Sequence, residues 1–239
     1  MSSYIEVKNV SKSFGGKAIL QDVSLSIEQG TAVGLVGANG VGKSTLLRIL
    51  VGLNTGFQGD VMVNNIPLEK KNLKTIRKNV GYVFQDADSQ LFMSTVFDDV
   101  AFAPRNYGMS EAEVNEKTME ALKVVHIEQL KDKQIYKLSG GEKKLASIAT
   151  ILSTEPDVIL MDEPSVALDP KNRRNLINIL NRLNQAKIIA SHDLNMIMDT
   201  CERTILLSDG KIIKDGNTKE ILLDKELMEE SGLELPLGY

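Results

Sequence analysis

The first thirty residues alternate between apolar and polar positions. Residues 4–10 and 23–27 follow a period of two, and the pair Gly15-Gly16 lies between them. A period of two is typical of strands with one buried face, and a glycine pair is typical of a tight turn. We therefore expect an antiparallel β layer at the start of the chain.

Short uninterrupted apolar runs alternate with segments of helical period over much of the remaining chain. Such runs suit strands that are buried on both faces of a parallel sheet, and the segments between them suit the helices that cover it. A hairpin arm is also expected over residues 59–65. The expected strands comprise residues 31–36, 79–84, 158–161, 187–190, 204–207 and 211–214, and the expected helices comprise residues 44–50, 172–183 and 194–200. This alternation predicts an α/β fold.

The middle of the chain has a different pattern. Apolar residues recur at spacings of three and four over residues 95–105, 110–125 and 141–152, which predicts three helices. We therefore expect a single domain over residues 1–239. Its α/β core would comprise residues 1–85 and 154–239, with residues 86–153 as an inserted helical subdomain.

Composition limits the possible classes of protein. The chain is 42% hydrophobic and 25% charged, as is ordinary for a globular protein, and its net charge of −4 argues against binding to nucleic acid. No apolar run approaches the roughly 20 residues that span a bilayer, and residues 1–6 have neither a basic flank nor an apolar signal core. The single cysteine, Cys201, excludes an internal disulfide and is expected to be a small apolar helix residue. The sequence therefore predicts a cytoplasmic protein.

A glycine-rich loop joins an apolar run to a segment of helical period. Residues 37–44, GANGVGKS, match the pattern G-x-x-x-x-G-K-[ST], in which backbone N–H groups surround phosphates at a helix N-terminus. Lys43 is expected to reach the β- and γ-phosphates, and the Ser44 hydroxyl is expected to bind Mg²⁺. The nucleotide-binding candidates here are Gly37, Ala38, Asn39, Gly40, Val41, Gly42, Lys43, Ser44 and Thr45. The loop predicts a nucleoside triphosphate site.

The apolar run at residues 158–161 ends in two carboxylates, Asp162 and Glu163. In a phosphate-loop protein, an acid at this position lies beside the loop, where it can hold Mg²⁺ directly or through water. We assign that role to Asp162. Glu163 would lie nearer the γ-phosphate, where it could orient the attacking water or accept its proton.

Ser139, Gly140, Gly141 and Glu142 stand at the start of a predicted helix. The serine hydroxyl and the glycine N–H groups could form a second anion-binding helix terminus. The same residues also fit a capping box, in which Ser139 and Glu142 satisfy the free N–H groups of the first turn. Both interpretations stay open at this stage, although capping alone does not require two glycines.

Together these motifs resemble those of ATP-binding cassette (ABC) ATPases, over nearly the whole chain. The resemblance implies a P-loop NTPase fold of the α/β class, with a mixed β-sheet core, an N-terminal antiparallel β layer and an inserted α-helical subdomain. The motifs follow the family's order: the Walker A loop (residues 37–44), the Q-loop residue Gln85, the signature (residues 138–142), the Walker B strand ending in Asp162 and Glu163, the D-loop (residues 165–169) and the switch residue His192.

The resemblance also implies a head-to-tail dimer, formed with a second copy or with a paralogue. ATP and Mg²⁺ would lie between the Walker A loop of one subunit and the signature of the other, so that Ser139, Gly140, Gly141 and Glu142 act across the interface. A single copy of each motif agrees with such an arrangement, because each subunit alone would hold two incomplete half-sites. The resemblance thereby implies a catalytic role for Lys43 and Glu163.

Three further roles come from the resemblance. Phe14 would stack on adenine, Gln85 would bind Mg²⁺ or water and sense the γ-phosphate, and His192 would hydrogen-bond the γ-phosphate. The residues themselves support these roles unevenly. A lone aromatic residue in a β region is more often core, whereas His192 follows a strand that ends at the same sheet edge as Asp162. The other histidine, His126, is expected to be structural.

Residues 83–92 and 95–102 are similar to the ATPase subunits of energy-coupling factor importers, including cobalt and nickel uptake ATPases. One departure is Asp86-Ala87, where that group usually has Asn-Pro. The resemblance implies a peripheral subunit at the cytoplasmic face of the cell membrane that powers import of a metal ion or vitamin through an integral membrane partner. Residues 91–93, Leu-Phe-Met, could line a groove for a partner helix or pack inside the helical region.

Two other functions fit the same motifs. A soluble ABC ATPase acting on ribosomes or DNA usually has two cassettes or a long coiled-coil insertion, and this sequence shows neither. A regulatory module that binds ATP without hydrolysing it would not need Glu163. The sequence therefore favours a transport ATPase.

Overall fold

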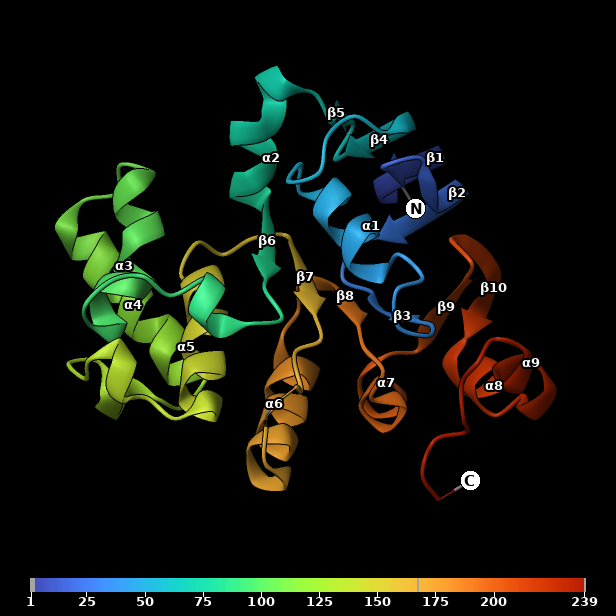
Figure 1. Ribbon diagram of the computed structural model, residues 1–239. Coiled ribbons are helices and arrows are strands. Elements are labelled where there is room, and N and C mark those ends of the chain that lie inside the picture. Colours follow the sequence, from blue (N-terminus) through green and yellow to red (C-terminus); the bar gives the residue numbers. More distant parts are fainter. Residues whose placement is uncertain (1–2, 167, 239) are drawn as a thin grey trace.

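A computed structural model describes residues 3–166 and 168–238 (Figure 1). Within these residues the strands form one four-stranded and one six-stranded sheet. The smaller sheet has the order β2-β1-β4-β5 and is antiparallel throughout. Its strands are β1 (Ser3–Phe14), β2 (Lys17–Glu28), β4 (Gln58–Val63) and β5 (Ile66–Pro67). The predicted antiparallel layer is confirmed.

The smaller sheet packs one face against the rest of the protein. Along β1, Ile5, Val7 and Val10 are buried, and they share a core with Leu46 and Leu47 of the helix α1 (Lys43–Leu50). The alternation seen in the sequence arises because successive side chains of a strand point to opposite faces. This layer lies next to α1, at the upper right of Figure 1.

The larger sheet has the order β10-β9-β3-β8-β7-β6. Neighbours from β9 to β6 run parallel, and β10 pairs antiparallel with β9. Its strands are β3 (Ala32–Val36), β6 (Val80–Val83), β7 (Val158–Asp162), β8 (Ala186–Ala190), β9 (Arg203–Ser208) and β10 (Lys211–Asn217). Every residue of β6, β7 and β8 is buried, as expected for strands covered on both faces.

Alternate residues of the central strands belong to two different cores. On β7, Leu160 packs in the core shared with α1, whereas Ile159 and Met161 pack with the helices of the opposite face. That opposite face is covered by α6 (Pro170–Arg182) and α7 (Leu194–Thr200). The remaining helices of this part are α2 (Leu73–Asn79), α8 (Thr218–Leu222) and α9 (Lys225–Glu230). None of these three was predicted, because segments of five to seven residues seldom show a clear helical period, although α7, also seven residues long, was predicted.

Three helices form a group beside the edge strand β6, on the left of Figure 1: α3 (Val96–Asn106), α4 (Glu111–Val124) and α5 (Gly140–Leu152). They contact one another, and α5 also contacts β6. The Leu-Phe-Met segment before α3 is divided between the two expected environments. Leu91 is buried, whereas Phe92 is 65% exposed and packs edge-to-face on the ring of Phe102.

No helix in the described part of the chain is both long and apolar enough to cross a membrane.

Candidate functional site

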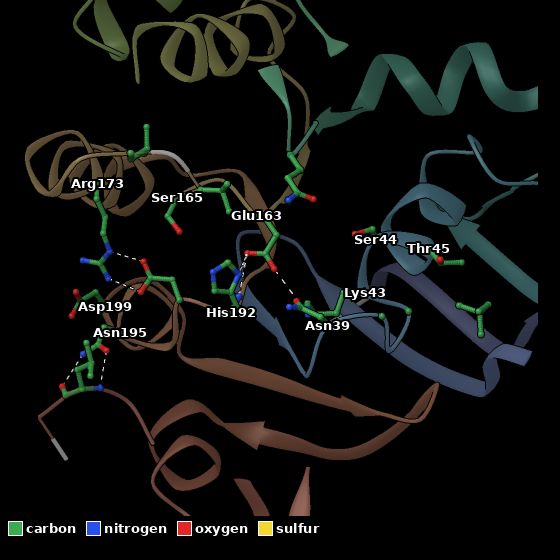
Figure 2. Close-up of a pocket in the computed structure, with 18 of the residues that line it drawn as sticks. Asn39, Lys43, Ser44, Thr45, Glu163, Ser165, Arg173, His192, Asn195 and Asp199 are labelled. Atoms are coloured by element: carbon green, nitrogen blue, oxygen red, sulfur yellow. Dashed lines mark hydrogen bonds and ion pairs between the residues drawn. The ribbon is translucent and has the colours of Figure 1, made fainter. Parts of the chain in front are cut away.

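Three strands of the larger sheet end beside one cavity of about 1190 Å³ (Figure 2). The glycine-rich loop follows β3, Glu163 follows β7, and His192 follows β8. These strands are parallel neighbours, with Ala190 in register with both Leu35 and Asp162. Their carboxyl ends therefore meet at one edge, where ligands of α/β sheets usually bind. Predicted site residues that line the cavity are Phe14, Asn39, Gly40, Gly42, Lys43, Ser44, Thr45, Gln85, Glu163 and His192.

The glycine-rich loop adopts backbone angles that require glycine at two positions. Gly37 has a φ of 152°, and a Cβ atom there would lie 2.2 Å from the Leu207 carbonyl oxygen. Gly42 has a φ of 110°, and its Cβ would lie 2.9 Å from the Ile19 carbonyl oxygen. Glycine is the residue that tolerates both demands. The loop thus passes close to β2 and β9 before α1 begins.

Lys43 is the first residue of α1 and is 6% exposed. Its ammonium donates to the carbonyls of Gly37 at 2.6 Å and Ala38 at 3.1 Å, and it lies 4.0 Å from Oε1 of Glu163. Burial lowers the pKa of Lys43, and the charges of Glu163 and Asp162 oppose that shift. Gly37 and Ala38 therefore contact the lysine, while neither they nor Val41 belong to the cavity lining.

Asp162 is fully buried at the end of β7. One of its oxygens, Oδ1, accepts a hydrogen bond of 2.8 Å from the Ser44 hydroxyl, and the other, Oδ2, accepts one of 2.9 Å from Tyr82. Ser44 lines the cavity and Asp162 does not, but their hydrogen bond places two oxygen ligands side by side. The described residues contain no group of three or more His, Cys, Asp or Glu that could hold a metal alone. Mg²⁺ fits such a site, because it is commonly bound by one or two protein oxygens together with water and phosphates.

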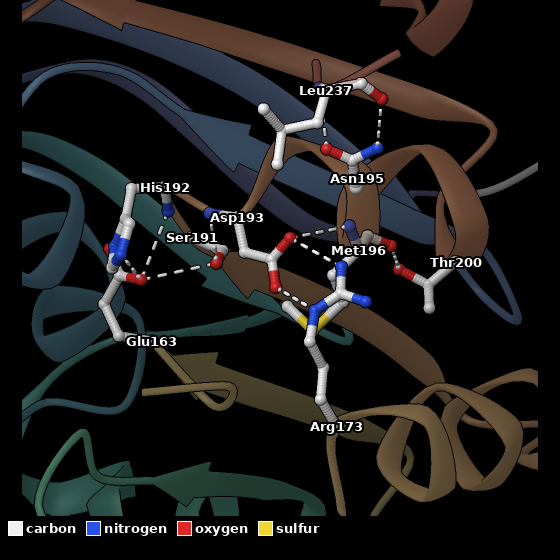
Figure 3. Close-up of polar contacts among 9 residues, drawn as sticks. All are labelled: Glu163, Arg173, Ser191, His192, Asp193, Asn195, Met196, Thr200 and Leu237. Atoms are coloured by element: carbon white, nitrogen blue, oxygen red, sulfur yellow. Dashed lines mark hydrogen bonds and ion pairs between the residues drawn. The ribbon is translucent and has the colours of Figure 1, made fainter. Parts of the chain in front are cut away.

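Glu163 lies in the left-handed region with a φ of 47° and is 6% exposed. Oε2 accepts hydrogen bonds from the Ser191 hydroxyl at 3.3 Å and the His192 backbone at 3.2 Å, and the His192 Nδ1 atom lies 2.8 Å from it (Figure 3). A non-glycine residue with this φ costs energy and is found preferentially at functional sites. The end of β8 therefore holds the carboxylate in place.

The structure adds a pair of residues that the sequence analysis missed. Arg173 of α6 bonds both carboxylate oxygens of Asp193, with Nη2 2.7 Å from Oδ1. Oδ1 also accepts the Met196 N–H at 3.0 Å and so caps α7. Burial acts to raise the pKa of Asp193, but the hydrogen bonds from Arg173 and Met196 outweigh it and lower the pKa. Capping of a helix that starts at Leu194 could have identified Asp193, whereas no local pattern singles out Arg173.

The predicted signature residues form the capping box. The Ser139 hydroxyl accepts the Glu142 N–H at 3.2 Å, and Glu142 accepts the Ser139 N–H at 2.8 Å. Packing also explains why position 141 is glycine, because a Cβ there would lie 2.7 Å from the Asn172 amide nitrogen. Of the described residues that line the large cavity, none comes from Ser139, Gly140, Gly141 or Glu142. The signature therefore contributes no residue to the cavity that the Walker A loop of the same chain lines.

Phe14 and Gln85 both line the cavity, and both are exposed, unlike residues of the core. Phe14 is 49% exposed, and the Lys12 ammonium lies 4.9 Å from its ring centroid. Gln85 is also exposed, and its backbone carbonyl accepts a 2.7 Å hydrogen bond from the Lys144 ammonium, which leaves the side-chain amide free. Both side chains are therefore free to meet a ligand in the cavity.

Of the other residues singled out in the sequence, Cys201 and His126 lie outside the cavity, whereas most of the D-loop lines it. Cys201 is 5% exposed, and its burial raises the pKa of the thiol to about 11. His126 is exposed, with a φ of 59°, just after α4. Four of the five expected D-loop residues are described, and three of them, Ser165, Val166 and Leu168, line the cavity. The fifth, Ala167, lies outside the described residues.

Known proteins resemble the chain over nearly its full length. The protein family described as ABC transporter matches residues 20–166. The energy-coupling factor transporter ATP-binding protein EcfA of Carboxydothermus hydrogenoformans is 39% identical over 241 residues, covering 99% of this chain and 89% of that protein. The structure of cbiO1 from Clostridium perfringens, part of the ABC transporter complex cbiONQ, has a TM-score of 0.85 at 33% identity and covers 96% of this chain and 94% of that one. The dimeric structure of the bacterial ABC transporter cassette MJ0796 has a TM-score of 0.81 at 30% identity and covers 90% and 98%.

Proposed function

The chain belongs to the ABC transporter family of ATP-binding proteins, and on that premise we propose that it hydrolyses ATP to power a membrane transporter. The observation that carries the proposal is the convergence of Lys43, Glu163 and His192 in one cavity. These side chains supply a cation for phosphates, a proton acceptor and a hydrogen-bond donor, which are the groups that phosphoryl transfer to water needs. The P-loop NTPase fold expected from the motifs is shown by the cassettes that the chain resembles.

The chain's own contacts suggest how these groups act. Lys43 exchanges the carbonyls of Gly37 and Ala38 for phosphate oxygens when a nucleotide enters. Glu163 presents Oε1 to the cavity because Ser191 and His192 hold Oε2, so that it can orient a water and accept its proton. His192, whose side chain is 58% exposed, is free to turn toward the γ-phosphate. Phe14 offers an open ring face to adenine.

Ser44 and Asp162 would hold Mg²⁺, with Gln85 as a further ligand that reaches it directly or through water. When bound there, Mg²⁺ would supply positive charge that stabilises the charge developing on the phosphate oxygens. Support comes from the 2.8 Å contact between the Ser44 and Asp162 oxygens, which places two suitable ligands at one point.

We propose that two subunits share each nucleotide. The signature residues Ser139, Gly140, Gly141 and Glu142 do not line the cavity of their own chain, so a partner must bring its copy to the phosphates. The similarity to MJ0796, whose structure is dimeric, supports this arrangement. ATP then joins the subunits and its hydrolysis releases them, which converts a local change of charge into movement. The partner can be a second copy or a paralogue.

The exposed pair Phe92 and Phe102 suggests where a membrane partner docks. Their ring centroids lie 4.8 Å apart, with Phe102 on α3 and Phe92 in the segment between Gln85 and α3. Exposed aromatic residues in contact are typical of recognition surfaces. The similarity to EcfA and cbiO1 favours an energy-coupling factor importer of a metal ion or vitamin, with this subunit at the cytoplasmic face of the cell membrane. In this proposal residues 86–153 form the helical subdomain, and residues 1–85 and 154–239 form the core.

The variant Glu163→Gln tests the proposal. Phosphate release by the purified protein should fall by at least about a hundredfold, because the proton acceptor is lost while the shape is kept. Dimers detected by size-exclusion chromatography should persist in the presence of ATP and Mg²⁺. Glu230→Gln, on the exposed end of α9, is the control and should hydrolyse ATP as the wild type does. If Glu163→Gln releases phosphate at the wild-type rate, Glu163 is not the proton acceptor.

A further inference from the structure

A tyrosine outside all the family motifs contacts the buried acid of the site. Tyr82 stands in the middle of β6, next to β7, and is 5% exposed. Its hydroxyl donates a 2.9 Å hydrogen bond to Oδ2 of Asp162. The other oxygen of the same carboxylate, Oδ1, is the one that faces Ser44. Each oxygen of the Asp162 carboxylate therefore has its own hydrogen-bond donor, Ser44 for Oδ1 and Tyr82 for Oδ2.

We propose that Tyr82 is a positioning residue for Mg²⁺: its hydroxyl holds Oδ2 of Asp162 so that Oδ1 points to the metal site beside Ser44. This inference rests on the proposed function, which makes Asp162 a magnesium ligand. A carboxylate that binds a metal is commonly oriented by a hydrogen bond to its other oxygen, and loss of such a contact weakens metal binding by about tenfold or more.

Two neighbours fix the direction of the Tyr82 proton and the position of its ring. Arg48, one turn after Ser44 on α1, donates to the Tyr82 oxygen at 3.4 Å. Because that oxygen already accepts from a guanidinium, the hydroxyl proton is directed toward Asp162. Phe84 packs edge-to-face on the Tyr82 ring with a centroid distance of 4.7 Å, which restricts its movement.

The hydroxyl is also needed to satisfy a buried charge. Among the described residues, Ser44 and Tyr82 are the hydrogen-bond partners of the Asp162 side chain. Phenylalanine at position 82 would fill the same space and leave Oδ2 without a donor. The carboxylate could then rotate so that either oxygen bonds Ser44, and the metal would meet a less defined ligand.

A second tyrosine gives a matched control at the other end of the same strand. Tyr4 donates its hydroxyl to Oδ2 of Asp157, which directly precedes β7, whereas Asp162 ends it. Tyr4→Phe therefore removes the same kind of contact from the same strand without touching the cavity.

The experiment measures Mn²⁺ affinity instead of turnover. The full chain is kept in excess over adenylyl imidodiphosphate, Mn²⁺ is added, and free Mn²⁺ is followed by its electron paramagnetic resonance signal. Affinity for the analogue in EDTA is measured separately by calorimetry. We expect Tyr82→Phe to raise the Mn²⁺ dissociation constant by about tenfold or more and to leave the metal-free affinity unchanged. Tyr4→Phe should match the wild type in both measurements.

Asp162→Asn separates failure of this inference from failure of the proposed function. If Asp162→Asn weakens Mn²⁺ binding and Tyr82→Phe does not, Tyr82 has no positioning role, although the proposed metal site stands. If Asp162→Asn binds Mn²⁺ as tightly as the wild type, the proposed metal site is wrong, and the role of Tyr82 falls with it. Thermal unfolding of both phenylalanine variants shows whether they are folded. If Tyr82→Phe weakens metal-free binding of the analogue as much as it weakens Mn²⁺ binding, the effect is not specific to the metal and the inference is also overturned.

Discussion

The Nδ1 atom of His192 lies 2.8 Å from Oε2 of Glu163, although the two residues follow different strands. The glutamate side chain is 8% exposed and the histidine side chain is 58% exposed. The contact therefore joins a buried carboxylate to a ring that reaches the cavity. It lets a residue that follows β8 hold the residue that follows β7.

Loss of the His192 side chain should slow hydrolysis more than it weakens binding. We expect His192→Ala to lower kcat by about a hundredfold, because the carboxylate loses one of its partners and the γ-phosphate loses a donor. ATP affinity should change little, since Lys43 and the loop remain. The measurement is steady-state phosphate release together with calorimetric ATP binding. His126→Asn, which suits the positive φ at that position, is the control, and an unchanged kcat in His192→Ala would contradict the assignment.

The two-point contact between Arg173 and Asp193 should matter for turnover through the position of His192. Lysine keeps the charge but lacks the planar fork that makes two parallel hydrogen bonds to a carboxylate, so Arg173→Lys weakens this contact. We expect kcat to fall by about tenfold while ATP affinity stays the same. The adjacent Arg174 is exposed, and Arg174→Lys serves as the control. Equal rates in the two variants would show that the pair has no part in catalysis.

Gly141 should be sensitive to the side chain of Asn172. Gly141→Ala brings a Cβ to 2.7 Å from the Asn172 amide, which cannot move freely because it donates to Asp169 at 2.7 Å. We expect a loss of about 1–2 kcal/mol in the free energy of unfolding, measured with urea.

Asn172→Ala in the same chain should restore much of that stability. A double-mutant cycle would then show a clear coupling energy between the two positions. Strictly additive effects would mean that the close approach does not explain the glycine. If the double mutant is stable and still inactive, Gly141 has a second role at the nucleotide.

Lys144 should make stability depend on pH above neutrality. It is 3% exposed, and burial lowers its pKa from 10.5 to about 8. Between pH 8 and 10.5 the unfolded chain therefore binds a proton at this residue that the folded chain has lost. Raising the pH through this window favours folding, by up to about 1.4 kcal/mol per pH unit.

Urea unfolding between pH 7 and 9.5 measures this contribution. The wild-type free energy of unfolding should rise relative to that of Lys144→Met as the pH passes 8. The half-buried neighbour Lys143, which pairs with Asp88, gives the control, and Lys143→Met should keep the wild-type pH dependence. Parallel curves for wild type and Lys144→Met would show that the lysine does not lose its proton in this window.

Local pattern was enough to predict the elements that matter most for the site. The period of two at residues 4–10 and the apolar run at residues 158–161 each became a strand, because burial on one or two faces leaves its mark on neighbouring residues. The motif at residues 37–44 predicted a loop before a helix, and α1 begins at Lys43. Short helices such as α8 were missed because their stability comes from packing and caps.

The choice between alternatives required distances between remote segments. The sequence left residues 91–93 with two possible environments, and the structure buries Leu91 while exposing Phe92. It left the serine-glycine-glycine segment with two roles, and the structure shows the cap directly. The burial of Leu91 and the exposure of Phe92 depend on how α3 and α5 pack against their neighbours, and a local sequence pattern does not predict this packing.

By itself, then, the sequence determined which residues can carry the chemistry: a lysine and serine at a helix start, and two acids at a strand end, are recognisable because each motif is continuous along the chain. Only the tertiary structure decided which groups meet. The bonds from Tyr82 to Asp162 and from Arg173 to Asp193 join residues 80 and 20 positions apart. Their geometry follows from strand register and helix packing, which are set by the whole core rather than by any one segment.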